Sequence, residues 1–268
     1  MTSRLGAAVV GGLLLLVLPA LAHAAAPGPR VAVEGTAFRV QLPDGSVLPQ
    51  DQLVGVVLTL GDGSGVQRRI RIDAVEHDTR DKLGEVMLYT LSEADPVSKQ
   101  WRNACDPDPD GRRLGFPLSG AFTPDGRYIA APGRILITCT GGAEGKCIRF
   151  GYKPWRTTPE GEALRPYYQT CVRLVRADYG GDGVGHTRNG TPIDLFDRIG
   201  IQRDEVAPGM TLEAAFDPDG AVCVAHPRLP GGISLDALGR QYPRLAGHLD
   251  ADCSEHVPAL LYVRSFGR

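Results

Sequence analysis

Beyond its first residues, this 268-residue chain lacks any apolar run long enough to cross a membrane, because a spanning helix needs about 20 predominantly apolar residues. It also lacks a clear excess of charge: 29 Lys and Arg stand against 31 Asp and Glu, a net charge of −2. A near-neutral chain gives no electrostatic reason to bind nucleic acid or an anionic membrane surface. We therefore expect no nucleic-acid partner and no membrane attachment of the mature chain.

The short motifs of common catalytic and metal centres are also missing. There is no nucleophile elbow of the form G-x-S-x-G and no H-E-x-x-H. There is no C-x-x-C pair, and no set of cysteines and histidines resembles a zinc site. The glycine-rich segment 181–185 follows an expected helix rather than a strand, which argues against a dinucleotide-binding loop. These absences favour a binding or structural module without a cofactor over an enzyme.

The N-terminus has the three parts of a secretory signal peptide. Arg4 supplies a positive charge, residues 7–21 form an apolar segment, and Ala22-His23-Ala24 is a small-x-small cleavage site. No cysteine that could carry a lipid follows the apolar segment. We expect cleavage after residue 24 and export to the periplasm or the extracellular medium. Loss of Arg4 would leave the mature chain with a net charge of −3.

The six cysteines all lie in the mature chain, and an even number behind a signal peptide predicts disulfide bonds. They are Cys105, Cys139, Cys147, Cys171, Cys223 and Cys253. The sequence does not determine how they pair, but proximity favours Cys139 with Cys147. This pair would face each other across a hairpin formed by residues 135–138 and 147–152.

Four Pro-Asp-Gly segments predict tight turns, because proline presets φ, aspartate bonds its neighbours and glycine accepts positive φ. Three of them lie between apolar stretches and predict hairpins over residues 38–48, 122–129 and 212–224. Strands are also expected at residues 53–60, 69–72, 85–91 and 259–266. Residues 25–100 are therefore predicted to form a β-rich N-terminal region.

One main helix is predicted at about residues 159–178. Apolar residues recur there at spacings of three and four, at Leu164, Tyr168, Cys171, Val172 and Val175. Thr158 could cap the helix, with Pro159 in its first turn and Gly180-Gly181 at its end. Pro166 interrupts the pattern, so a kink there or a start nearer to it is the alternative.

The predicted fold class is α+β: mostly antiparallel β-structure with one main helix, stapled by disulfides. The predicted organisation is a signal peptide (1–24), the β-rich region (25–100) and a second region (101–268). That second region would hold the main helix, a short helix after Ser234 and a C-terminal hairpin.

The loop that follows the main helix is the best candidate for a chemical site. It contains Asp178, Asp182, His186 and Asp194 among glycines that allow close backbone approach. His186 is the side chain here that titrates near neutral pH, and Asp182 or Asp194 could orient it. A hydrolase or transferase using this histidine is therefore one alternative. The other is structural, with the aspartates capping turns and His186 bonded to a carbonyl.

Two further alternatives concern a thiol and calcium. Cys171 could be a nucleophile beside His186, but its place on the apolar stripe favours a disulfide. Asp106, Asp108 and Asp110 match the opening of a calcium loop with oxygens at alternate positions. The position that needs a bidentate glutamate is Pro117, so an acidic turn is the competing interpretation.

Residues 176–179, Arg-Ala-Asp-Tyr, are followed by Gly181-Asp182-Gly183, His186-Thr187-Arg188 and Gly190-Thr191, and this series resembles the ADYC domain family of bacterial secreted proteins. The same pattern is met by Trp101 with Cys105, Gly141-Gly142, Lys146-Cys147, the segment 151–155, Ile193-Asp194 and the segment 220–223. The similarity covers roughly residues 100–225 and could extend from residue 35.

The resemblance implies a shared fold and export but no particular reaction. Gly180 stands where the family motif has a cysteine. Any role of that cysteine is therefore absent here. If it forms a disulfide in relatives, its partner must be free or paired differently in this chain.

Overall fold

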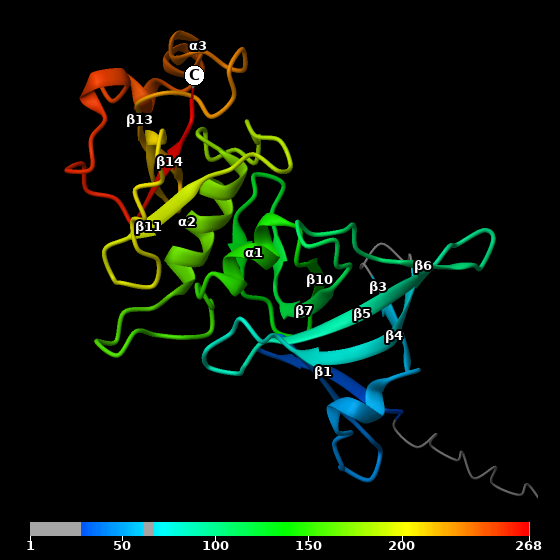
Figure 1. Ribbon diagram of the computed structural model, residues 1–268. Coiled ribbons are helices and arrows are strands. Elements are labelled where there is room, and N and C mark those ends of the chain that lie inside the picture. The colour runs from blue at the N-terminus through cyan, green and yellow to red at the C-terminus, as the bar shows by residue number, and fades with distance from the viewer. Residues whose placement is uncertain (1–27, 62–66, 268) are drawn as a thin grey trace, which may run out of the picture.

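The computed structural model describes residues 28–61 and 67–267. The signal peptide expected at residues 1–24 lies outside these residues. Within them, two antiparallel sheets flank a pair of packed helices (Figure 1). No helix among the described residues has both the length and the apolar character needed to span a bilayer.

The larger sheet is built mainly from residues of the predicted β-rich region. Its strands run in the order β10-β7-β5-β4-β3, with β6 paired to the end of β5. In β4, Ile70 and Ile72 are fully buried while the arginines that flank them point outward, as the alternating pattern predicts. The strands are β3 (Val57–Gly61), β4 (Gln67–His77), β5 (Met87–Ala94), β6 (Trp101–Asn103), β7 (Gly115–Ser119) and β10 (Ile135–Cys139).

The smaller sheet is formed by the C-terminal part of the chain, in the order β11-β14-β12-β13. It confirms the hairpin predicted over residues 212–224 and the closing strand. Its strands are β11 (Asp194–Asp197), β12 (Thr211–Asp217), β13 (Gly220–Val224) and β14 (Leu261–Ser265).

Two small strand pairs and three single 3₁₀ turns complete the chain. The pair β8 (Ala121–Phe122) and β9 (Tyr128–Ile129) confirms the hairpin predicted over residues 122–129. The hairpin predicted over residues 38–48 is closed by one bridge between Gln41 and Val47, because the main partner of β2 is β1. The remaining elements are β1 (Arg30–Glu34), β2 (Ala37–Gln41), η1 (Gln50–Leu53), η2 (Pro243–Leu245) and η3 (Asp250–Asp252).

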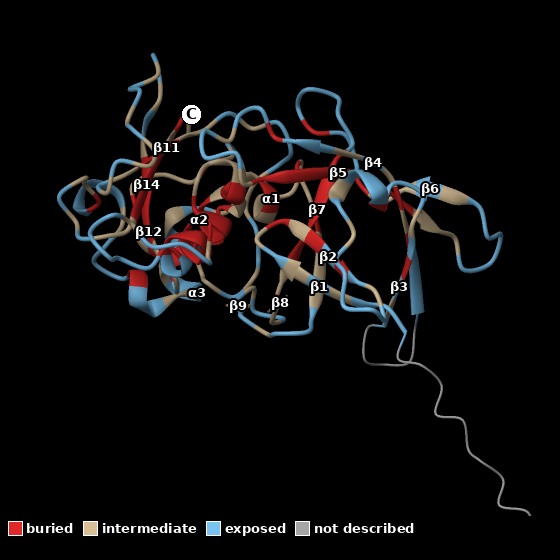
Figure 2. Ribbon diagram, turned by 90° about the horizontal axis from the view of Figure 1, so that it is seen from below, coloured by how far each residue is buried: buried red, intermediate tan, exposed pale blue. Residues whose placement is uncertain are grey.

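The described residues contain three short α-helices instead of one main helix: α1 (Ala143–Arg149), α2 (Arg165–Arg176) and α3 (Leu235–Gln241). Helix α2 contacts β12 and β14 of the smaller sheet, whereas α1 contacts β10 of the larger sheet and also packs on α2. The buried residues follow this line from β5 and β7 through α2 to β14 (Figure 2). The helix pair thus joins two sheets into one core.

Helix α2 is shorter than the helix predicted at 159–178. It begins at Arg165, with Pro166 in its first turn, where the missing backbone N–H would have no partner. The start near Pro166 is thus correct, and the cap at Thr158 with Pro159 is wrong, since residues 157–163 form a bridged turn. The helix ends at Ala177, which adopts a left-handed conformation with φ of 48°, before the predicted glycines.

The hairpin predicted from residues 135–138 and 147–152 is also wrong. Strand β10 pairs with β7, and residues 143–149 form helix α1. Gly145 explains why the helix can lie so near the end of β10: a side chain at that position would overlap the carbonyl group of Cys139. The apolar residues Cys147 and Ile148 are then buried on one side of α1.

All six cysteines form disulfides, as predicted, but the pairing Cys139–Cys147 is wrong. The bonds are Cys105–Cys139, Cys147–Cys171 and Cys223–Cys253. Cys147 belongs to a helix whose buried side faces α2, so its nearest thiol is Cys171 rather than its neighbour in sequence. All six cysteines lie among the described residues and none of them is free, so Cys171 is no thiolate nucleophile.

Candidate functional site

The end of α2 organises the loop that holds the candidate residues. Asp178, 1% exposed, forms an ion pair with Arg173 at 2.5 Å. Its carboxylate also accepts the backbone N–H groups of Gly181, Asp182 and Gly183, at 2.8, 3.2 and 3.0 Å. Because these bonds occupy both oxygens, the aspartate fixes the backbone of the loop.

Arg228, Glu213 and Tyr179 form a buried network beneath the same loop. The Arg228 guanidinium contacts both carboxylate oxygens of Glu213 at 2.9 Å, and the Tyr179 hydroxyl donates to Glu213 at 2.9 Å. Arg228 also donates to the carbonyl oxygens of Leu174 and Val175. These carbonyls lie in the last turn of α2, where few backbone donors remain. Leu174 also accepts the backbone N–H of Ala177. The network therefore ties α2 to the smaller sheet.

His186 lies on the loop but is paired with neither carboxylate proposed for it. Its ring stacks on Tyr179 with a centroid distance of 5.7 Å, and its Nε2 is buried without a hydrogen-bond partner among the described residues. Asp182 accepts a bond from the Tyr242 hydroxyl, and Asp194 accepts one from the backbone N–H of Glu205. The structure therefore does not assemble an acid–histidine pair. Catalysis by His186 stays a prediction.

Burial lowers the pKa of His186 from its usual value near 6.5, and the nearby charges of Asp182 and Asp178 oppose this shift. The unfolded chain thus binds a proton at a higher pH than the folded chain does. We expect the free energy of unfolding to fall as the pH drops through about 6.5, and to fall less in His186→Gln. Urea unfolding at pH 7.5, 6.5 and 5.5 measures the difference. Parallel pH dependences of the two proteins would contradict it.

In the acidic turn at residues 106–110, the carboxylates of Asp108 and Asp110 already have partners within the protein. Asp108 is buried and accepts bonds from the backbone of Asp110 and Arg112 and from the Thr140 hydroxyl. Asp110 forms an exposed ion pair with Arg80. No cluster of three or more potential metal ligands occurs within the described residues. The calcium alternative for Asp106, Asp108 and Asp110 stays a prediction without support from this geometry.

At Gly180, where the family motif has a cysteine, the ring of Tyr242 fills the space. A side chain at Gly180 would overlap this ring. The Tyr242 hydroxyl then reaches the carboxylate of Asp182 at 2.9 Å. Since the chain has no free cysteine, the loss of the motif cysteine leaves no unpaired thiol behind.

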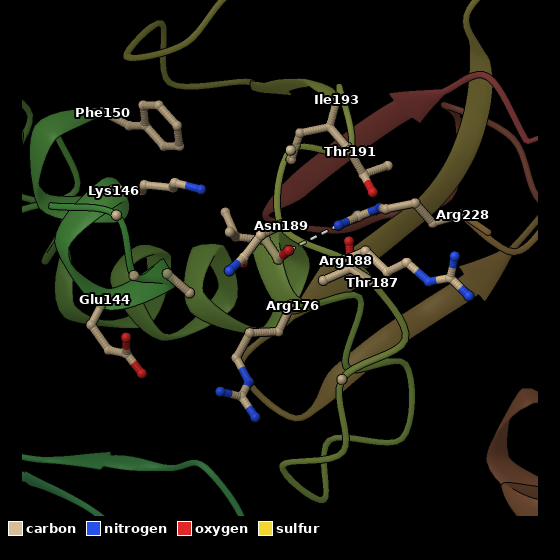
Figure 3. Close-up of a pocket in the computed structure, with 16 residues that line it drawn as sticks. Glu144, Lys146, Phe150, Arg176, Thr187, Arg188, Asn189, Thr191, Ile193 and Arg228 are labelled. Carbon is tan, nitrogen blue, oxygen red and sulfur yellow. Dashed lines mark hydrogen bonds between the residues drawn. The ribbon is translucent and has the colours of Figure 1, made fainter. Parts of the chain in front are cut away.

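A pocket of about 490 Å³ opens between α1 and the loop. We call it the loop pocket. One wall is Gly141, Gly142 and the first turns of α1, and the other is residues 187–193. In Figure 3, Lys146 extends from α1 toward the side of the pocket where Asn189 lies, and Thr191 and Arg228 stand on the opposite side. The motif segments separated along the sequence thus line one cavity.

The loop pocket has a cationic lining. Four basic residues and one acid, Glu144, line it. Arg228 is neutralised by Glu213, but the other three bases have no ion pair among the described residues. These three are Lys146, Arg176 and Arg188. Backbone groups of Gly141, Gly142 and Gly190 add polar surface without side chains in the way.

The fold and the pocket define a disulfide-bonded, mostly antiparallel domain with a cationic cavity at the end of its central helix. The family model of the ADYC domain matches residues 50–230. This chain therefore belongs to the ADYC domain family, as its motifs predict. Comparison with the curated proteins and with the solved structures finds no match.

The loop selected from the sequence lines part of this pocket, but the sequence did not indicate most of the other lining residues. Thr187, Arg188 and Asn189 belong to the predicted loop, whereas Lys146 and Arg176 were assigned no role. Both residues lie in segments that match the family motif, and this match could have indicated a role for them. Arg228 follows the last motif segment and had no signal, because its burial depends on contacts with α2 and β12.

Proposed function

We propose that this protein is an exported binding module, in the periplasm or the extracellular medium, that holds a small anionic ligand in the loop pocket. The observation that carries the proposal is the set of three unpaired bases, Lys146, Arg176 and Arg188, around a cavity with one acid. Unpaired cations on a concave surface attract anions and form charge-assisted hydrogen bonds with them.

Export is supported by two independent features of the chain. The N-terminal residues have the charge, apolar segment and cleavage site of a signal peptide. The three disulfides require an oxidising compartment to form and persist. Neither feature separates the periplasm from the extracellular medium, so the proposal includes both.

The hydrolase or transferase alternative has less support than binding. A general base must be oriented and must reach its substrate. His186 has a buried Nε2 and stacks on Tyr179, and no carboxylate bonds to its ring among the described residues. A role in the packing of the loop accounts for these contacts. The three bases of the loop pocket have no ion pair among the described residues, and Arg176 is held by one bond to the carbonyl oxygen of Gly183 at 2.7 Å.

Lys146→Glu is expected to weaken anion binding by about 10- to 30-fold, because a charge contact at 4 Å contributes about 1 kcal/mol in water and reversal changes its sign. The measurement is isothermal titration calorimetry of the mature, disulfide-intact protein with citrate and with inorganic phosphate at low salt. Citrate offers three carboxylates to the three unpaired bases.

Lys99→Glu is the matched control. Lys99 is exposed and lies outside the loop pocket, so this variant should bind both anions as the wild type does. Equal weakening in the two variants would show a general charge effect and would reject the site. Absence of binding of either anion to the wild type would reject the proposal itself.

A further inference from the structure

A second cleft of about 570 Å³ lies on the other side of Phe150 from the loop pocket. Phe150 lines both cavities, at the upper edge of the view in Figure 3. This volume falls within the roughly 300–1,000 Å³ typical of organic-ligand sites. We call it the Lys153 cleft. Its apolar lining includes Leu83, Phe150, Leu164, Ile199 and Ile201.

The wall of the Lys153 cleft is a built structure. Lys153 is 2% exposed, and its ammonium group donates to Asp81 at 2.8 Å and to Glu85 at 3.1 Å. Asp81 in turn accepts the backbone N–H groups of Glu85 and Val86. Burying these charges is unfavourable unless each is paired and hydrogen-bonded. The network therefore fixes the segment that carries the rim of the cleft.

One lining cation lacks a partner. Five basic residues line the cleft, and four of them have acidic partners: Arg80 with Asp110, Arg149 with Asp78, Lys153 with Asp81, and Arg156 with Glu85. The fifth, Lys82, is exposed and has no ion pair among the described residues. Lys82 is thus the one lining cation that forms no ion pair in the described part of the chain.

An apolar side chain stands next to that charge. Leu83, adjacent to Lys82, is 66% exposed and lines the same cleft. Exposed apolar surface gains free energy when a ligand removes it from water. An inorganic anion would leave this surface wet, and a neutral apolar molecule would leave Lys82 uncompensated. The two features together select a ligand that has both an apolar body and one negative charge.

We propose that the Lys153 cleft binds an amphipathic organic monoanion, with its apolar body between Leu83, Phe150 and Ile201 and its anionic group beside Lys82. This site is separate from the loop pocket and does not depend on the function proposed there. The ligand class follows from one unpaired cation beside a mixed apolar wall.

Isothermal titration calorimetry with three probes tests the ligand class on the mature, disulfide-intact protein. Sodium decanoate has both features, acetate has the charge alone, and 1-decanol has the apolar chain alone. Decanoate is expected to bind at least about tenfold more tightly than either of the others. Decanol binding as tightly as decanoate would overturn the role of charge, and acetate binding as tightly would overturn the role of the apolar wall.

Two surface variants locate the site. Lys82→Glu and Leu83→Asn are each expected to weaken decanoate binding about tenfold or more, and both positions are exposed enough for the fold to tolerate the change. Lys99→Glu should leave it unchanged. Lys146→Glu separates the two cavities: it should reduce citrate binding and leave decanoate binding intact. Decanoate affinity that is unchanged in both Lys82→Glu and Leu83→Asn would overturn the proposal.

Discussion

Arg228→Met is expected to lower the free energy of unfolding by about 3–5 kcal/mol, the range for removing one partner of a buried ion pair. Arg228 and Glu213 are 1% and 0% exposed at their side chains, so Glu213 would be left charged without a counterion. The carbonyl oxygens of Leu174 and Val175 would also lose the bonds from Arg228, and Leu174 would keep only the backbone N–H of Ala177. Urea unfolding of the disulfide-intact protein at pH 7.5 measures the change.

Two variants control for this result. Arg240→Met removes one partner of the exposed pair with Asp236, and such pairs contribute at most about 1 kcal/mol. Arg228→Met combined with Glu213→Met removes both charges, and it should be more stable than Arg228→Met alone because no buried charge is left unpaired. A single variant as stable as Arg240→Met would show that the network contributes little to stability.

Replacing both Cys147 and Cys171 with alanine is expected to lower the free energy of unfolding by about 3–4 kcal/mol. The bond closes a chain separation of 24 residues, and cross-links of this span restrict the unfolded state by about that amount. It also joins α1, which carries Lys146, to α2, which carries Arg176. We therefore expect citrate binding in the loop pocket to weaken as well.

The bond between Cys223 and Cys253 provides the comparison. Its separation of 30 residues is similar, so its removal should destabilise the chain by a similar amount. Neither β13, which carries Cys223, nor η3, which precedes Cys253, contributes a lining residue to the loop pocket, so citrate binding by the folded protein should persist. Urea unfolding and calorimetry on both double variants give the two readouts. Equal loss of citrate affinity in the two would show that the effect on binding is general destabilisation.

The features that could be predicted from sequence are those determined by neighbouring residues. The Pro-Asp-Gly turns at 124–126 and 218–220 form the expected hairpins, because the backbone preference of each residue acts locally. The Ser234 side chain accepts the N–H of Ala237 at the start of α3, as predicted for a helix cap. The alternation of polar and apolar residues in β4 also identified its buried face, because successive side chains of a strand point to opposite sides.

The predictions that failed concern contacts between distant segments. Sequence proximity suggested that Cys139 pairs with Cys147, but α1 turns Cys147 toward Cys171 on α2. The apolar pattern predicts a helix from residue 159 because it does not reveal the bridged turn at residues 157–163. The sequence predicts that Asp182 or Asp194 orients His186. In the structure the Tyr242 hydroxyl donates to Asp182 and the backbone N–H of Glu205 donates to Asp194. The ring of His186 stacks on Tyr179 instead.

The sequence by itself therefore determined the turns, the alternation of polar and apolar residues in the strands, the presence of disulfides and the family. It also indicated the loop after α2 as the candidate site. The tertiary structure decided the cysteine pairing, the bounds of the helices and both cavities. The physical reason is range: backbone preferences and periodicity act over a few residues, whereas a pocket lined by Lys146, Arg188 and Arg228 depends on how segments tens of residues apart pack. That packing is driven by burial of the common core, which sequence pattern identifies without giving its arrangement.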